Sequence, residues 1–353
     1  MKMYRLMLML VVLPMIFCTL QAQEDTFDYE NYRNQRLAER FYNEAVTDVN
    51  NLDYYGALYL LDSAILIQPN FAPAYIERGK IYYTKERTTD ALNEFRQVLS
   101  FEPNNGEAKF NEAFVRFTED TSSVSSADFD KAIKNGFTKP EAYYYRGLLL
   151  VLEKRYNDAI ADFTMAIEKD PNYAKAYHDR GTAKFHIGDY QGAIYDYRLA
   201  ITYDPDLLLA YLNMGAAKKE IGDFQGAEQD YTALLNVDSS YYAAYNNRGG
   251  ARFILGDIKG AQSDFDKAYE LNPDSYEVAC NMGNVISKSG KYNDAIEWFD
   301  KSIELNPEYK NTYLDRGLTY ELLGMLTEAC ADWKKAEELG SEEAEKYLSE
   351  CNN

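Results

Sequence analysis

Apolar residues recur with helical spacing along most of this chain, and the whole pattern repeats every 34 residues. Nine consecutive units run from residue 38 to residue 343 without an insertion or deletion. The eighth residue of each unit is small: Ala45, Gly79, Ala113, Gly147, Gly181, Gly215, Gly249, Gly283 and Gly317. The twenty-fourth is large: Leu61, Phe95, Phe129, Phe163, Tyr197, Tyr231, Phe265, Phe299 and Trp333. Alanine dominates the twentieth position, and proline stands at the thirty-second in six units.

Each unit predicts two helices joined by a short turn. In the first helix an aromatic fourth residue and the small eighth residue share one face, because they lie one turn apart. Gly-Asp pairs such as Gly188-Asp189 mark the turn, and proline ends the second helix. A single unit cannot bury its apolar face alone, so consecutive units must stack.

This pattern resembles the tetratricopeptide repeat over residues 38–343. The resemblance implies an all-α, right-handed superhelical solenoid of nine helix-turn-helix units, with units 1–3 at residues 38–139 and units 4–9 at residues 140–343. It also implies a concave groove lined by the first helices, which binds a peptide segment or a partner helix. Such arrays are protein-interaction scaffolds and not enzymes.

The third unit, residues 106–139, departs from the pattern. Lys109 replaces the aromatic residue, Phe137 replaces the proline, and the Ser-rich run 120–126 lowers helix propensity. We expect either a shortened second helix or a hinge here.

Residues 1–22 have the features of a cleaved export signal. Lys2 and Arg5 precede a 12-residue apolar run, and Ala22 offers a small residue before Gln23. Lipidation at Cys18 and an uncleaved anchor are the alternatives. Residues 23–37 form an acidic leader or N-terminal cap. We therefore expect an exported protein of the periplasm or cell envelope; the Ala-Gln site and the sequence around Trp333 resemble repeat proteins of Bacteroidetes-type bacteria.

Charge narrows the class of partner. The 353-residue chain has 37 basic and 57 acidic residues, a net charge of −20, which disfavours nucleic acid and favours a neutral or basic protein segment. The 32 tyrosines are interpreted mainly as packing residues copied from unit to unit. Membrane contact is expected only if Cys18 is lipidated.

The C-terminal residues 341–353 are predicted to form a polar capping helix, from Ser341 to about Ser349, and a tail. A helical hairpin that turns at Gly340 brings Cys330 and Cys351 to one level, which predicts a disulfide in an exported protein. The alternative is two unpaired cysteines. Cys280 is expected to be an inert helix residue.

Five units pair an arginine in the first helix with an acid sixteen residues later. The predicted ion pairs are Arg78–Glu94, Arg146–Asp162, Arg180–Asp196, Arg248–Asp264 and Arg316–Asp332. A structural role is favoured over a row of arginines that binds an acidic ligand.

Groove contacts are expected at the sixth residue of the first helices and its neighbours. Three consecutive units carry asparagine there, whose carboxamide donates and accepts hydrogen bonds and so suits a peptide backbone. This resembles the asparagine ladder of the O-linked N-acetylglucosamine transferases; an unused surface is the alternative. The candidate residues are Asn43, Asn111, Asp179, Asn213, Asn247, Asn281 and Asp315, with His178, Asn246 and Asn284 beside them.

Two other classes of site are not expected. Repeat domains that bind the acidic C-terminus of heat-shock chaperones need Lys, Arg and Asn at set offsets; Lys175 fits, but Asp179 stands where the arginine should be. No phosphate-binding loop or metal-ligand spacing occurs, and His178 and His186 lack a third ligand, so no cofactor, metal or catalytic residue is predicted. We expect a non-enzymatic envelope scaffold; the alternative is a lipoprotein subunit of an envelope assembly, secretion or uptake machine, anchored through Cys18.

Overall fold

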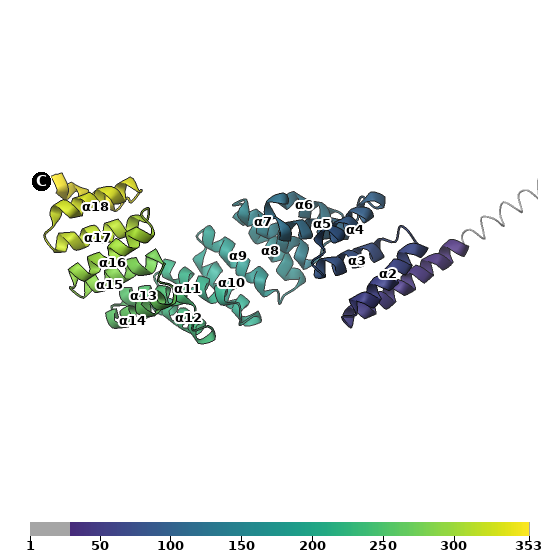
Figure 1. Cartoon of the computed structure of the whole chain (residues 1–353), viewed down its shortest axis with the longest axis horizontal. Coiled ribbons are helices and arrows are strands. Elements are labelled where there is room, and N and C mark those ends of the chain that lie inside the picture. Colours follow the sequence, from purple (N-terminus) through teal and green to yellow (C-terminus); the bar gives the residue numbers. More distant parts are fainter. Residues whose placement is uncertain (1–28, 353) are drawn as a thin grey trace, which may run out of the picture. The chain divides into compact units, whose positions relative to one another are not determined.

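The computed structural model describes residues 29–352, and every regular element in that range is helical. The expected export signal, Cys18 and residues 23–28 of the leader lie outside the described residues. The chain divides into two compact units, one ending at Glu153 and one beginning at Lys154. Within each, consecutive helices pack against one another along the chain (Figure 1). The described residues contain no helix with the length and apolar character needed to cross a membrane.

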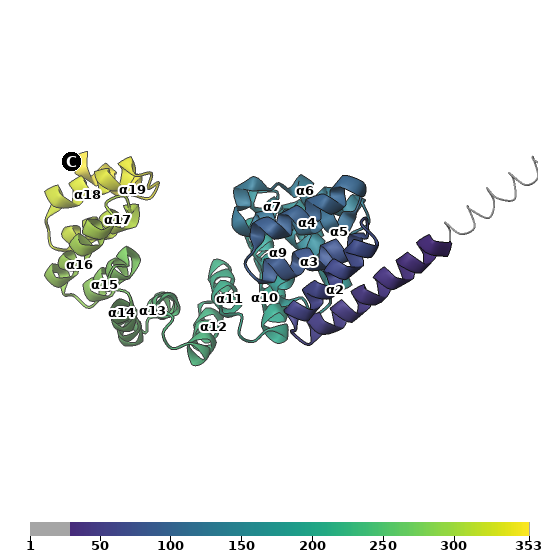
Figure 2. The same cartoon turned by 45° about the vertical axis from the view of Figure 1, so that its right-hand side comes forward.

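The first compact unit begins with a helix over residues 29–50, so the described part of the leader is helical. Figure 2 shows this helix beside α2 and continuing beyond it. The elements that follow are α2 (Tyr54–Ile67), α3 (Ala72–Thr84), α4 (Thr88–Phe101), α5 (Gly106–Glu119), the 3₁₀ turn η1 (Thr121–Ser123), α6 (Ser126–Lys134) and α7 (Pro140–Leu152).

The second compact unit continues the same alternation to the C-terminus. Its elements are α8 (Tyr156–Lys169), α9 (Ala174–His186), α10 (Tyr190–Tyr203), α11 (Leu208–Glu220), α12 (Phe224–Val237), α13 (Tyr242–Leu255), α14 (Ile258–Leu271), α15 (Tyr276–Lys288), α16 (Tyr292–Leu305), α17 (Lys310–Leu322), α18 (Leu326–Glu338), α19 (Ala344–Leu348) and the 3₁₀ turn η2 (Ser349–Asn352).

The helix boundaries keep the 34-residue register of the sequence. From α3 to α17, the first helices begin at residues 72, 106, 140, 174, 208, 242, 276 and 310, and each second helix except α6 begins at the corresponding place. This constant register, with no strand in the described range, confirms the predicted all-α solenoid of helix pairs.

Small residues at the eighth position let the two helices of a pair approach closely. A Cβ atom added to Gly181 would lie 2.9 Å from the ring of Tyr197, and one added to Gly283 would lie 2.5 Å from the ring of Phe299. Alanine therefore does not fit there without displacement of a buried ring. The prediction that a small residue at these positions lets the neighbouring helix approach closely is confirmed.

The turn between paired helices has a left-handed residue followed by a capping aspartate in several repeats. Gly188 has a φ of +81°, and the Asp189 carboxylate accepts a hydrogen bond from the backbone N–H of Gly192 at 3.0 Å. Glycine adopts this φ without steric cost, and the carboxylate satisfies a backbone donor that has no partner inside the helix.

The second helix of the third repeat is short. Its register predicts a start near residue 122, but the chain forms η1 there and α6 begins only at Ser126. Asp120 accepts from the Ser122 N–H, and Ser125 and Asp128 form a reciprocal capping box that starts the shortened helix. Of the two expectations for this repeat, the structure has the shortened helix.

The C-terminal cap is shorter than predicted. Gly340 ends the last paired helix with a φ of +85°, but the capping helix begins at Ala344 and gives way to η2 at Ser349. The Tyr347 ring stacks on the Trp333 ring with centroids 5.1 Å apart. A stacked aromatic contact and a turn therefore cover the last repeat where a longer polar helix was expected.

Candidate functional site

The first helices of the second compact unit carry eight of the candidate contact residues, all of them half-buried. We call this surface the first-helix face and define it by the fifth, sixth and ninth residues of α9, α11, α13, α15 and α17. Because the register is constant, equivalent residues fall at the same place on each helix. The candidates on this face are His178, Asp179, Asn213, Asn246, Asn247, Asn281, Asn284 and Asp315.

A hydrogen-bonded chain joins α9 to α11 on this face. The His178 Nδ1 lies 2.8 Å from the Asp179 Oδ1, and its Nε2 lies 3.1 Å from the Asn213 Nδ2. A neutral imidazole with its proton on Nδ1 satisfies both contacts, since it donates to the carboxylate and accepts from the amide. The carboxamide of Asn213 is therefore used within the protein.

Asn281 makes the corresponding contact between α13 and α15. Its Nδ2 donates to the Asn246 Oδ1 at 2.8 Å. In both cases the sixth residue of one first helix reaches the fifth residue of the preceding one, 35 residues back along the chain. These asparagines hold neighbouring repeats together, which is a structural use of residues predicted as ligand contacts.

Asp315 on α17 is half-buried and bonded to α15. Its Oδ2 accepts from the Asn284 Nδ2 at 2.7 Å and from the Cys280 thiol at 3.5 Å. Burial raises the pKa of the Asp315 carboxyl and raises the pKa of the Cys280 thiol well above its ordinary value. The thiol is thus protonated at neutral pH and not nucleophilic, in agreement with the expected inert role of Cys280.

Asn247 differs from its neighbours in the ladder. It makes no hydrogen bond or ion pair with any residue in the described part of the chain. The fifth residue of the preceding first helix is Leu212, which has no polar atom to pair with the carboxamide. The Asn247 side chain is half-exposed, and its donor and acceptor are not used by the described residues.

Open space lies beside Asn247 along α13. Gly250, three residues further on, would present an added Cβ to nothing within 4 Å, whereas a Cβ on the adjacent Gly249 would lie 2.7 Å from the Phe265 ring. Glycine inside a helix costs about 1 kcal/mol relative to alanine. Packing explains that cost at Gly249 but not at Gly250.

One buried tyrosine hydroxyl lacks the hydrogen-bond partner that the equivalent tyrosine has in the preceding repeat. Tyr197 donates to the Thr182 Oγ1 at 3.2 Å, but Ala216 replaces that threonine in the next repeat. The Tyr231 hydroxyl is consequently buried without a hydrogen-bond partner among the described residues, and burial raises its pKa. The Gln68 Oε1 and the Trp333 Nε1 are likewise buried without a hydrogen-bond partner among the described residues, so such groups occur in several repeats.

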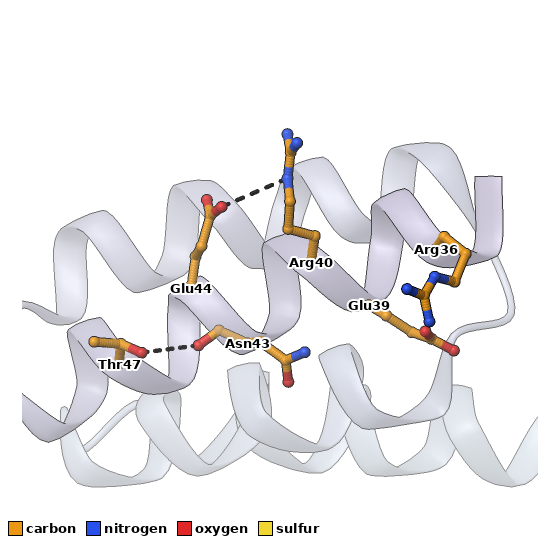
Figure 3. A pocket seen from close by; sticks show the side chains of 6 residues that line it. All are labelled: Arg36, Glu39, Arg40, Asn43, Glu44 and Thr47. Atoms are coloured by element: carbon orange, nitrogen blue, oxygen red, sulfur yellow. Dashed lines mark hydrogen bonds and ion pairs between the residues drawn. The ribbon is translucent and has the colours of Figure 1, made fainter. Parts of the chain in front are cut away.

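Two candidate residues lie in the first compact unit and differ in access. Asn111 is buried, and its Nδ2 donates to the Glu107 carbonyl at 2.8 Å, which leaves little of it for a partner. Asn43 is exposed on the helix over residues 29–50, in a surface hollow shown in Figure 3. The hollow is lined by Arg36, Glu39, Arg40, Asn43, Glu44 and Thr47.

The arginines of the first helices make structural ion pairs. In the closest of four predicted pairs, the Arg248 Nη2 lies 2.6 Å from the Asp264 Oδ1; Arg78–Glu94, Arg180–Asp196 and Arg316–Asp332 are also present. The same arginines reach the second helix of the preceding repeat, as Arg78 does with Asp62. Arg146 pairs with Asp130 at 2.9 Å, and its predicted pairing with Asp162 stays a prediction. These guanidinium groups form ion pairs that hold neighbouring repeats together, and they are mostly buried.

Consecutive helix pairs of constant length define an all-α repeat solenoid. Tetratricopeptide-repeat family models match residues 72–105, 140–173, 163–195, 212–276 and 283–324, which together make up more than half of the sequence. The chain is a tetratricopeptide repeat protein. No curated protein matches it.

Solved structures support the fold assignment. A tetratricopeptide repeat protein from Parabacteroides merdae is 16% identical over 80% of this chain and 99% of its own, with a TM-score of 0.51. Pseudomonas aeruginosa PilF is 20% identical over 60% of this chain and 97% of its own, with a TM-score of 0.51. The Cut9–Hcn1 hetero-tetramer of the APC/C contains a chain 15% identical over 84% of this chain and 59% of its own, with a TM-score of 0.56. At these identities the likeness concerns the fold alone.

The described residues contain no cluster of three or more His, Cys, Asp or Glu able to hold a metal ion.

Sequence reasoning missed two features of the molecule. The first is a set of exposed tyrosines in the repeats: the interpretation of tyrosine mainly as a packing residue does not apply to Tyr55, Tyr59 and Tyr195. The orphaned Tyr231 hydroxyl was also missed, although the change from Thr182 to Ala216 at the ninth position was a visible signal.

Proposed function

We propose that this protein is a non-enzymatic interaction scaffold that binds an extended peptide segment across the first-helix face, centred on α13. The unpartnered Asn247 carboxamide carries the proposal. An amide that both donates and accepts matches the alternating N–H and C=O groups of an extended backbone. The bare Gly250 beside it lets that backbone approach the helix closely.

The neighbouring contacts favour binding at this one place over binding along the whole asparagine ladder. Asn213 and Asn281 are already bonded to His178 and Asn246, so a ligand that used them would have to replace existing bonds. Asn247 requires no such exchange. The carboxylates of Asp179 and Asp315 on the same face, with the net charge of −20, favour a neutral or basic segment.

A displayed peptide library selected on the immobilised full-length mature protein tests this proposal. Peptides that bind should lose at least about tenfold in affinity to Asn247→Ala, which is about 1.4 kcal/mol. They should lose more to Gly250→Leu, whose side chain fills the open space on α13. Asn236→Ala, an exposed polar residue on α12, is the matched control and should bind as the wild type does. Full retention of binding by both α13 variants would contradict the proposal.

We further propose that the interaction takes place in the cell envelope. The basic residues and apolar run of the first 22 residues support export, and so does the position of Cys330 and Cys351, whose Cα atoms lie 5.8 Å apart. Mass spectrometry of the mature N-terminus separates the two forms of this proposal. A chain that starts at Gln23 supports a free periplasmic scaffold, and an acylated Cys18 supports the alternative of an anchored lipoprotein subunit.

A further inference from the structure

The outer face of α2 is apolar and exposed. Tyr55, Tyr59 and Leu66 are 88, 71 and 83% exposed, and their spacing places them on one side of the helix. Leu52, in the turn just before α2, is 71% exposed. We call these four residues the α2 face. Isolated exposed apolar residues are ordinary on protein surfaces, but a group confined to one helix face indicates an interaction surface.

The other repeats show that folding does not require apolar residues at two of these places. In every other repeat, the residues equivalent to Tyr55 and Leu66 are exposed and polar. The equivalents of Tyr55 are Thr89, Ser123, Asn157, Gln191, Gln225, Lys259, Asn293 and Thr327. The equivalents of Leu66 are Ser100, Lys134, Glu168, Thr202, Asn236, Glu270, Glu304 and Glu338. The same fold therefore forms eight times with polar side chains at both places.

Charge distinguishes the α2 face from the rest of the molecule. Asp62 is the one charged residue among the 14 of α2, and its Oδ1 lies 2.5 Å from the Nη1 of Arg78. The whole chain, in contrast, carries a net charge of −20. Two copies of the chain repel each other over most of their surfaces, and this face, whose one carboxylate is paired with Arg78, is where they can meet with the least repulsion. A basic partner would gain more from the acidic surface elsewhere.

We infer that the α2 face is a homodimer contact, in which the faces of two copies pack against each other around a two-fold axis. A two-fold contact uses the same patch on both subunits, so one apolar patch is sufficient. Tyrosine is favoured in such interfaces because its ring buries a large area while its hydroxyl remains able to bond.

The size of the face sets the strength of the contact. Two tyrosines and two leucines bury roughly 500 Å² per copy, compared with about 800 Å² per partner in an interface of standard size. The dimer is therefore weak and dissociates on dilution. It leaves the first-helix face of the second compact unit unchanged, so this inference is independent of the proposed peptide binding.

Sedimentation equilibrium of the full mature chain over a wide range of concentrations tests the inference. The wild type should pass from monomer to dimer as the concentration rises, and Tyr55→Gln/Leu66→Glu should stay monomeric. Both substitutions introduce residue types that other repeats carry at the same positions, so the fold should be retained, and the circular dichroism melt checks this. Tyr195→Gln, which removes an exposed tyrosine from α10, is the matched control and should dimerise like the wild type.

A second variant keeps the test decisive if the double substitution disturbs folding. Tyr59→Cys places a thiol at the middle of the α2 face, and mild oxidation should join two copies through this residue. A wild type that is monomeric at every concentration would overturn the inference, as would a double variant that dimerises with an unchanged constant. Flotation of a monomeric wild type with phosphatidylcholine vesicles would also overturn it, because the face would then bind a membrane surface.

Discussion

Gly249 packs against the ring of Phe265 so closely that a Cβ atom at Gly249 would lie 2.7 Å from the Phe265 Cε1. The next residue, Gly250, faces open space. Two adjacent glycines in α13 thus have opposite reasons to be glycine. The contact between paired helices requires glycine at position 249. No packing contact of the described chain requires glycine at position 250.

This difference predicts opposite effects for two equivalent substitutions. Gly249→Ala should lower the free energy of unfolding by about 1–3 kcal/mol, because a methyl group must displace a buried ring. Gly250→Ala should raise it by up to about 1 kcal/mol, because alanine favours the helix and meets no neighbour. Urea unfolding followed by circular dichroism measures both. A stability loss in Gly250→Ala equal to that in Gly249→Ala would show that the space beside Gly250 is filled in solution.

The ion pair between Arg180 and Asp196 makes a second prediction. The Arg180 Nε and Nη2 donate to the two carboxylate oxygens at 2.9 and 2.7 Å, and Asp196 is fully buried. Arg180→Met should lower the free energy of unfolding by about 2–3 kcal/mol, since it leaves the buried carboxylate with Lys184 as its remaining cation. Thermal melts give the comparison with Lys335→Met, whose pair with Glu338 is exposed and should contribute about 0.5 kcal/mol or less. If Arg180→Met left the melt unchanged but abolished peptide binding, the arginines would be ligand contacts.

Much of the fold, but less of the site, could be predicted from the sequence. Helix starts follow from a repeat whose small and aromatic residues must meet, so one register predicts helix pairs from α3 to α18. The contacts on the first-helix face depend on which side chains of adjacent helices come within hydrogen-bond distance. The position of Asn247 in the sequence pattern is the same as that of Asn213 and Asn281, and only the presence of Leu212 opposite it leaves its carboxamide unpaired. Periodicity predicts a face, but not the pairing of residues on that face.

Asp315 predicts an unusual dependence of stability on pH. Burial raises the pKa of this carboxyl above its ordinary value of 3.8, so the folded chain takes up its proton more readily than the unfolded chain. Its contribution to stability is complete below the unfolded pKa and is lost as the pH rises through the higher folded pKa. Asn284 and Cys280 from α15 face the group, and the Glu343 carboxylate also contributes to the rise in pKa.

Asp315→Asn should therefore melt at a higher temperature than the wild type at neutral pH. Its carboxamide oxygen can still accept from Asn284, but the buried charge is gone. The difference between the two melting temperatures should shrink as the pH falls from 7 through the raised pKa of the wild-type carboxyl, because that group then also becomes uncharged. Asp274→Asn, at an exposed turn, is the control for general acid effects. A difference that stays constant with pH would contradict this account of Asp315.

The last prediction concerns the bond that would close the C-terminal cap. The Cα atoms of Cys330 and Cys351 lie 5.8 Å apart and are separated by 21 residues, within the range in which a disulfide forms. A bond across a loop of this length contributes on the order of 3 kcal/mol, largely by restricting the unfolded chain. Non-reducing peptide mapping of the protein purified without reductant should recover the two cysteines in one linked peptide pair, with Cys280 as a free thiol that alkylates only after unfolding. Reduction should lower the melting temperature of the wild type but not of Cys330→Ser/Cys351→Ser. Recovery of both cysteines as free thiols would disprove the bond, and would leave the stacking of Tyr347 on Trp333 as the main support of the cap.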